Sequence, residues 1–335
     1  MKKLMNQPEN FVKETVEGII AAYGNKVKLL NGDIATYVSN YPVQDGKVGV
    51  VTAGGSGHLP VFLGYVGKGM LDGCTVGNVF ASPSAAKMAE VIRACDRGSG
   101  VLCLYGNYGG DKLNLEMACE MVEMDDIETR QVFVRDDLAS SPIEHADRRR
   151  GVAGMVYAYK IAGAAAERMM NLDQVTAVVE KALENIRTMG VALSPCIVPQ
   201  AGKPTFTIAD DEMEVGMGIH GEPGIEVCKM MTADQTAELI VGRLLEEIKL
   251  NPGDQVSVMV NGLGATPLEE QFIVYRRVHQ LLSEKGVTII MPHVGEYATS
   301  MEMAGLSITL FKLDEQLKDL LLSPAETPFY TNLNK

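Results

Sequence analysis

The chain has 335 residues, of which 46% are hydrophobic and 22% are charged, and its formal net charge is −13. This composition is typical of a soluble globular protein with room for two domains. The acidic balance argues against a nucleic-acid partner, because binding to a phosphate backbone depends on clustered lysine and arginine.

Neither a membrane nor an oxidising compartment is indicated. No apolar stretch is long enough to cross a bilayer, and the two N-terminal lysines are not followed by the apolar core of a signal peptide. The six cysteines contain no CxxC pair and no companion histidine spacing. We therefore expect reduced core cysteines in a cytoplasmic protein, with no zinc site and no disulfide framework.

Apolar runs of strand length alternate along the chain with segments of helical period, which predicts an α/β fold. Helices are expected over residues 11–20, 85–95, 152–170, 173–189 and 233–250, the last one ended by Asn251-Pro252-Gly253. Strands are expected over residues 48–53, 101–105, 131–135, 256–260, 287–291 and 307–313. An antiparallel pair is expected at 205–208 and 212–215, on either side of a polar turn.

After Gly190 the predicted helices give way to short strands and a polar turn, so we predict two α/β domains. Each has a mixed or parallel sheet flanked by helices. The first, residues 1–190, contains glycine-rich loops with His58 and Asp111, and the second, residues 191–335, contains a loop with His220.

Three predicted strands end in glycine-rich loops, at residues 54–58, 106–111 and 261–264. Ligands of open α/β sheets bind beyond the carboxyl ends of the strands, where His58 and Asp111 follow two of these loops. Each loop alone also fits a purely structural turn. The chain lacks GxxxxGK[ST] and GxGxxG, so it shows no nucleotide site of a familiar kind.

The run GMGIHGEPG, residues 216–224, places four glycines and a proline around His220. Each glycine inside a helix or strand costs about 0.5–1 kcal/mol relative to alanine, so this run predicts a loop. It is either a site where a small ligand approaches the imidazole or a surface turn with an incidental histidine. A nucleophilic imidazole, a second histidine and an aspartate that accepts a hydroxyl proton would together form a small-molecule site.

Two further segments allow a functional and a structural interpretation. Ser82, before Pro83, offers a hydroxyl and an amide to a polar ligand, or else Ser82 or Ser84 caps a helix. The run 148–150, three arginines, is a solvated helix start or a contact for a phosphate or an acidic partner. The remaining histidines are interpreted as structural or solvated: His145, His279 and His293.

Taken in order, the motifs resemble the substrate-binding subunit of dihydroxyacetone kinase over essentially the whole chain. They are GGSGH at 54–58, GNVFASP at 77–83, NYGGD at 107–111, RRGVAG at 149–154, GMGIHGEPG at 216–224 and NGLGATPLEEQ at 261–271. The resemblance implies a homodimeric kinase subunit of glycerol metabolism that binds its ketone as a covalent hemiaminal. It also implies a helical partner subunit that carries ATP-Mg, or a phosphotransferase-system donor, so that this chain binds neither a cofactor nor a metal.

Carried over by position, the resemblance implies that His220 forms the hemiaminal. Asp111 is then the catalytic base, with His58 as its histidine partner. The residues expected to bind substrate are Gly55, Ser56, Ser82 and Gly106.

The sequence departs from the family pattern at three positions. Ala53 and Leu59 replace the usual first glycine and glutamate of GGGSGHEP, and Gly106 stands where a lysine usually precedes Asn-Tyr. Loss of that lysine predicts space for a longer ketose, so a kinase subunit for a four-carbon ketose such as erythrulose is an alternative to one for dihydroxyacetone. A non-catalytic ketose sensor that controls a transcription activator is an alternative of another class.

Overall fold

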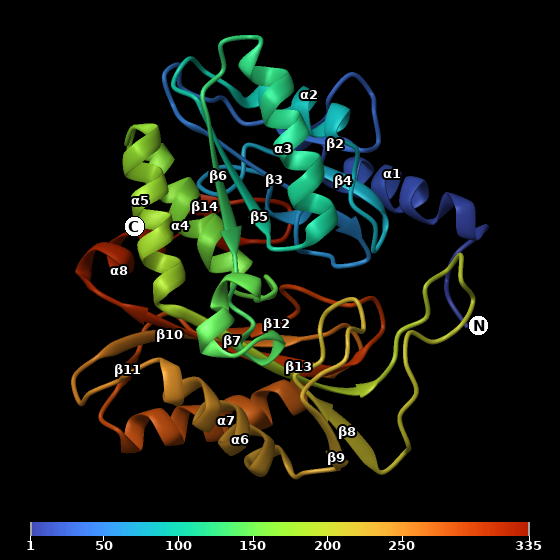
Figure 1. The fold of residues 1–335 in the computed structure, drawn as a ribbon, viewed down its shortest axis with the longest axis vertical. Helices are drawn as coiled ribbons and strands as arrows, with labels where there is room; N and C mark the ends of the chain where they lie inside the picture. The colour runs from blue at the N-terminus through green and yellow to red at the C-terminus, as the bar shows by residue number, and fades with distance from the viewer. Residues whose placement is uncertain (1, 334–335) are drawn as a thin grey trace.

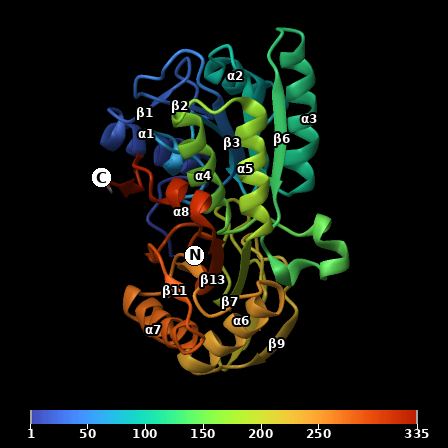
Figure 2. The ribbon, with the colours of Figure 1, turned by 90° about the vertical axis from the view of Figure 1, so that its left-hand side faces the viewer.

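The chain folds around two β-sheets, which occupy the upper and lower halves of the computed structural model in Figure 1. The structure describes residues 2–333. Between the sheets run helices that pack on both of them (Figure 2). Within the described residues, no helix combines the length and hydrophobicity that crossing a lipid bilayer requires.

The upper sheet has six strands in the order β1-β2-β4-β3-β5-β6. Its four central and edge strands β4, β3, β5 and β6 are parallel, whereas β1 and β2 are antiparallel to their neighbours. The strands are β1 (Val27–Leu29), β2 (Thr36–Ser39), β3 (Gly49–Ser56), β4 (Gly73–Val79), β5 (Val101–Gly106) and β6 (Thr129–Val134).

Both faces of this sheet are buried, because side chains alternate between two cores along each strand. Leu102 and Leu104 of β5 point into the central core, while Cys103 and Tyr105 point into the outer one. The outer core is closed by α2 (Ala85–Cys95) and α3 (Gly109–Glu123), and α1 (Phe11–Tyr23) packs at the central core.

The lower sheet has the order β11-β10-β13-β7-β8-β9, with β12 paired to β10. Its outer face is covered by α6 (Ala233–Glu247) and α7 (Leu268–Glu284). The strands are β7 (Ile186–Ser194), β8 (Glu212–Val215), β9 (Glu226–Lys229), β10 (Gln255–Gly262), β11 (Thr288–Ile289), β12 (His293–Gly295) and β13 (Ala304–Leu313). Near the C-terminus, β14 (Ala325–Glu326) and β15 (Thr331–Asn332) form a separate hairpin.

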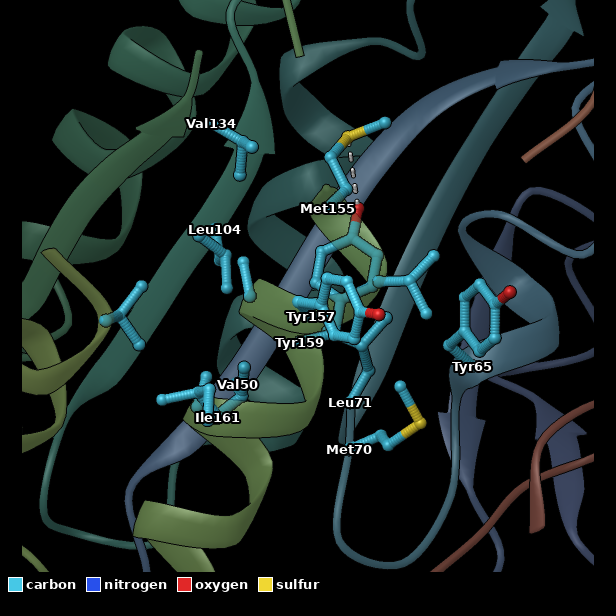
Figure 3. Close-up of a cluster of buried hydrophobic side chains, with 14 of the residues drawn as sticks. Val50, Tyr65, Met70, Leu71, Leu104, Val134, Met155, Tyr157, Tyr159 and Ile161 are labelled. Carbon is cyan, nitrogen blue, oxygen red and sulfur yellow. Dashed lines mark hydrogen bonds between the residues drawn. The ribbon is translucent and has the colours of Figure 1, made fainter. Parts of the chain in front are cut away.

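Helix α4 (Met155–Glu167) lies at the centre of the molecule, alongside α5 (Leu172–Glu184) and α8 (Glu315–Leu322). It is buried on nearly every side, as expected of a helix that is apolar all round. Figure 3 shows Met155, Tyr157 and Tyr159 of α4 beside Leu104 of the upper sheet. Tyr157 also contacts Phe311 of the lower sheet, with tilted rings and centroids 5.2 Å apart, so one core joins both sheets.

The predicted α/β class, with two sheets flanked by helices, is confirmed. The helix predicted at 85–95 has the observed bounds, and the six cysteines are free, five of them buried. The predicted division at Gly190 is not tested by the structure and stays a prediction. Gly190 itself lies inside β7, opposite Ser307 of β13.

Two predicted elements are wrong. The helix predicted over 173–189 ends at Glu184, because Ile186 onward pairs with β13 and so belongs to a strand. Residues 205–208 form no strand; β8 pairs instead with β7 and β9.

The small residues of α4 predict a measurable stability effect. A β-carbon at Gly163 would lie 2.4 Å from the backbone of Met70, so Gly163→Ala should destabilise the protein by about 1–3 kcal/mol through overpacking. The matched change Gly242→Ala, on α6, meets nothing within 4 Å and should stabilise it by roughly 0.5–1 kcal/mol. Urea denaturation of both variants measures the difference, and equal midpoints would contradict the central position of α4.

Candidate active site

Loops from both sheets meet at one place between them. His58 follows β3, and Asp111 lies in the first turn of α3, directly after β5. Because β3 and β5 are parallel neighbours, these residues share the carboxyl edge of the upper sheet. His220 reaches the same place from the β8–β9 loop of the lower sheet, with its ring centroid 4.6 Å from that of His58.

His58 is a buried, neutral imidazole with one unused nitrogen. Its Nδ1 lies 2.7 Å from the carbonyl oxygen of Thr299, which can only accept, so Nδ1 carries the proton and Nε2 the lone pair. Burial, assisted by nearby His220, lowers the pKa of His58 to about 3. Nε2 is buried and finds no hydrogen-bond partner among residues 2–333, so it is an acceptor available to a ligand.

Asp111 is the second buried acceptor. Only 6% of the residue is exposed, and its Oδ1 has no partner among the described residues. Burial raises the pKa of Asp111 above its usual value, while a hydrogen bond from Ser82 and the charge of His220 act in the opposite direction. Ser82 reaches this turn because residue 110 is glycine: a β-carbon there would lie 2.8 Å from the Ser82 hydroxyl.

His220 is more exposed and is held by a carboxylate two residues along the chain. Its Nδ1 lies 2.9 Å from Oε1 of Glu222, and its backbone N–H donates to Oε2 of the same carboxylate at 2.9 Å. Burial opposes ionisation of Glu222, but the hydrogen bond and electrostatic interaction with His220 outweigh it, with smaller contributions from a backbone hydrogen bond and then the charge of Arg150, and lower its pKa to about 2. An ionised Glu222 accepts the proton on Nδ1, which leaves the Nε2 lone pair of His220 free.

Aromatic rings confine both imidazoles. Phe80 stacks on His58 with centroids 4.8 Å apart and meets the edge of His220 at 5.3 Å. Tyr108 meets His220 at 4.8 Å, and its hydroxyl donates to the carbonyl oxygen of Gly151. Phe80 has a φ of 57°, a strained value for a bulky residue.

The predicted substrate-binding residues have different positions. Ser82 lies beside Asp111, and the observed cap residue of α2 is Ser84. Gly55 allows close packing, since a β-carbon there would lie 2.7 Å from the amide nitrogen of Ala81. The hydroxyl of Ser56 donates to the carbonyl oxygen of Gly77 at 2.7 Å, so it is already used within the sheet.

The space next to Gly106 is not vacant. A β-carbon at this position would lie 3.1 Å from the ring of Tyr108 and 3.2 Å from Sδ of Met155. These two side chains lie close to Gly106, and the space predicted for a longer ketose from the missing lysine stays a prediction.

Residues 148–150 are not a solvated helix start, so that interpretation of the arginine run is wrong. Arg149 is 1% exposed and makes two hydrogen bonds with Glu247 of α6, at 2.7 and 2.6 Å. Arg150 is ion-paired with Asp137, and Arg148 alone is exposed. Of the other histidines, His145 and His279 are exposed and His293 is buried between Tyr157 and Tyr330, as their structural or solvated interpretation predicts.

Several residues of the site were not predicted from the sequence. Glu222 and Phe80 lie inside motifs already recognised, so their proximity to His220 and Gly77 was an available signal. Thr299 contributes only a backbone carbonyl, which no sequence pattern reveals. Arg150 contacts residues up to 72 positions away, and only the fold brings them together.

A cavity in the described part of the chain is lined by the His58 loop but not by the other residues of the site. It has a volume of about 570 Å³ and is lined by α1, the N-terminal segment and residues 55–59. His220, Asp111 and Ser82 do not line it. The unpartnered polar atoms mark the candidate site better than this cavity does, because they show which ligand groups could bind and a cavity volume does not.

The chain is a two-sheet α/β protein with a small polar site between the sheets. Two loops that follow parallel strands of one sheet and the His220 loop of the other sheet form this site. The Dak1 domain family model matches residues 17–329, and the chain belongs to this family. The resemblance to the substrate-binding subunit of dihydroxyacetone kinase is thereby confirmed.

Relatives fall into two lengths. A PTS-dependent dihydroxyacetone kinase 2, dihydroxyacetone-binding subunit DhaK, of Listeria innocua is 46% identical, covering 98% of this chain and 99% of the relative. An L-erythrulose kinase of Pectobacterium atrosepticum is 45% identical, but its match covers 98% of this chain and only 56% of that protein. A solved structure titled dihydroxyacetone kinase operon co-activator Dha-DhaQ superposes with a TM-score of 0.88 at 31% identity, covering 95% of this chain and 98% of the other.

The neutral, buried state of His58 predicts a dependence of stability on pH. Its folded pKa of about 3 lies below the ordinary value of 6.5, so below about pH 6.5 the unfolded state binds the extra proton first. The free energy of unfolding should therefore fall on acidification, by about 2 kcal/mol from this residue between pH 7 and pH 5.

Urea denaturation at both pH values tests this expectation. In His58→Gln the decrease should be smaller by that amount, whereas the exposed control His279→Gln should behave like the unmodified chain. An undiminished decrease in His58→Gln would show that His58 is not buried in its neutral form.

Proposed function

We propose that this chain is the substrate-binding subunit of a dihydroxyacetone-kinase-type enzyme and that His220 captures the ketone carbonyl. One observation carries the proposal. Two buried acceptors, His58 Nε2 and Asp111 Oδ1, have no hydrogen-bond partner among the described residues, and the His220 ring contacts that of His58. Leaving such atoms unpaired costs about 1–3 kcal/mol each, and ligand hydroxyls would remove that cost. A short ketose has both the hydroxyls and the carbonyl that this arrangement requires.

In the proposed capture step, Nε2 of His220 attacks the carbonyl carbon and forms a carbon–nitrogen bond. The π electrons of the C=O bond move to oxygen while the Nδ1 proton passes to Glu222. Glu222 then returns one proton through water to the new alkoxide oxygen and is an anion again. The product is a neutral hemiaminal, and no atom is lost. Glycerol has no carbonyl and cannot react, so the step selects ketones over polyols.

In the proposed transfer step, the terminal hydroxyl oxygen attacks the phosphorus of the donor. The bond from that phosphorus to the rest of the donor breaks, and the leaving group keeps the electron pair and stays on the partner. Asp111 accepts the hydroxyl proton, and His58 accepts a hydrogen bond that orients the substrate. Burial raises the pKa of Asp111, which makes it a stronger base than an exposed carboxylate. Catalysis would therefore depend on positioning and charge rather than on a metal held by this chain.

The donor belongs on another polypeptide in this proposal. Relatives named as subunits match this chain end to end, whereas the erythrulose kinase is much longer than the matched region. The relatives are kinases, which supports the predicted class of phosphotransferase with an alcohol group as acceptor. A partner subunit with ATP-Mg or a phosphotransferase-system donor, a homodimeric state and a cytoplasmic location stay predictions.

Two alternatives rest on specific observations. A four-carbon ketose is supported by the relatives named erythrulose kinases, 45% and 42% identical to this chain. A ketose sensor is supported by the structural likeness to an operon co-activator. His58, Asp111 and His220 are all present, so we favour a catalytic subunit.

Changing Asp111 to Asn should separate capture from phosphoryl transfer. The variant should still gain the full mass of dihydroxyacetone, without loss of water, in native mass spectrometry. Its turnover with a competent donor subunit should fall at least about 100-fold, the usual contribution of a general base. Asp126→Asn, an exposed change beyond the same helix, is the control, and full turnover by Asp111→Asn would exclude Asp111 as the base.

A comparison of dihydroxyacetone with both erythrulose enantiomers decides the length of the ketose. Because the ring of Tyr108 and Sδ of Met155 lie close to Gly106, we expect a larger kcat/KM for dihydroxyacetone. A higher value for either erythrulose would establish the tetrulose alternative. Adduct formation without turnover on any of the three, with an active donor subunit, would favour the sensor.

A further inference from the structure

The arginine run ends in a side chain that contacts both halves of the site. Nε and Nη2 of Arg150 lie 2.9 and 2.8 Å from Oδ2 of Asp137, which follows β6 of the upper sheet. Nη2 also donates to the carbonyl oxygen of Gly216 at 3.2 Å, and Nη1 lies 3.8 Å from Oε2 of Glu222. Gly216 and Glu222 belong to the His220 loop, so one guanidinium joins that loop to the upper sheet.

The shape of the loop depends on this contact. A β-carbon at Gly218 would lie 2.2 Å from Oε2 of Glu222 and 2.5 Å from Nη1 of Arg150. Any larger residue at 218 would displace the carboxylate or the guanidinium. This glycine of GMGIHGEPG therefore accommodates Arg150 and Glu222, in addition to any room that the loop provides for a ligand.

We propose that Arg150 is a positioning residue for His220: it holds Glu222 as an anion on the Nδ1 side of the imidazole and thereby keeps Nε2 free for the ketone. The inference rests on the proposed function, because it assigns a purpose to the free nitrogen. Arg150 touches neither of the unpartnered acceptors, so its effect on the ketone passes through Glu222 and His220.

The charges around Glu222 support this role. Glu222 contacts the His220 ring, and Arg150 is the one Arg or Lys side chain paired with it in the described part of the chain. His58 is neutral, and burial raises the pKa of the Tyr108 hydroxyl well above its usual value, so neither supplies a charge. Asp111 carries no positive charge, so it does not stabilise an ionised Glu222 either.

The acidic neighbours of Arg150 are themselves fixed. Asp136 accepts hydrogen bonds from the backbone N–H groups of Val152 and Gly154, at 2.8 and 2.7 Å. Burial raises the pKa of Asp137 to about 7, and the charge of Arg150 opposes that rise. Removing Arg150 alone would leave Asp137 buried without a cation, which endangers folding.

The test therefore uses the double variant D137N/R150M, which removes both buried charges together. The matched control is D137N, which keeps Arg150 beside Gly216 and Glu222, and R150K tests rescue by a smaller cation. Long-range ¹H–¹⁵N NMR of the histidine rings reports the tautomer of His220 without any ketose. Native mass spectrometry with dihydroxyacetone reports the adduct.

We expect His220 to carry its proton on Nδ1 in the unmodified chain and in D137N, and to exchange between tautomers in D137N/R150M. The dihydroxyacetone concentration for half-maximal adduct should rise at least about tenfold in the double variant, with partial recovery in R150K. The acid limb of adduct formation should move to higher pH, because loss of the Arg150 charge raises the pKa of Glu222. A merely structural role would leave both the tautomer and this pH profile unchanged.

An unchanged tautomer in D137N/R150M would overturn the inference, whatever the ketose does. If the tautomer changes but the unmodified chain forms no adduct, the positioning role of Arg150 stands and the proposed capture by His220 fails. The two failures are thus distinguishable in one set of samples.

Discussion

The packing of α4 between the two sheets is the constraint on which the site depends. His58 and Asp111 belong to the upper sheet and His220 to the lower one, so their mutual distance is set by what separates the sheets. Helix α4 separates the sheets. It is rich in alanine and contains Gly163, which packs directly on the backbone of Met70. Close packing of this kind changes little with temperature or ligand, which suits a site that needs fixed geometry.

Much of the fold could be predicted because its signals are local. The strands that end in glycine loops and the amphipathic helices follow from hydrophobic period alone. The end of the helix predicted at 173–189 could not be found this way, since residues 186–189 continue its apolar pattern. They become a strand because Ile186 and Thr188 pair with Phe311 and Thr309, more than 100 residues later.

The same distinction applies to the site. His58, Asp111 and His220 are visible in the sequence because each lies in a glycine-rich run, at the end of β3, at the start of α3 and in the β8–β9 loop. The role of Arg149 was not visible, because its partner Glu247 is 98 positions away and nothing near either residue marks the pair. Buried charge pairs join distant segments by nature, so the sequence presents them as ordinary surface residues.

The site also shows where stability is given up. Two buried acceptors lack partners among residues 2–333 and Phe80 adopts a strained φ, and each of these features costs about 1–3 kcal/mol. A fold free of functional demands would remove these costs with a single hydroxyl donor or a glycine. Their presence at the meeting point of two sheets is best explained by a ligand that supplies hydroxyl donors. The ion pair of Arg149 with Glu247 of α6 and the contacts of Arg150 with Asp137 and Gly216 join the segment after β6 to the lower half of the molecule beside this site.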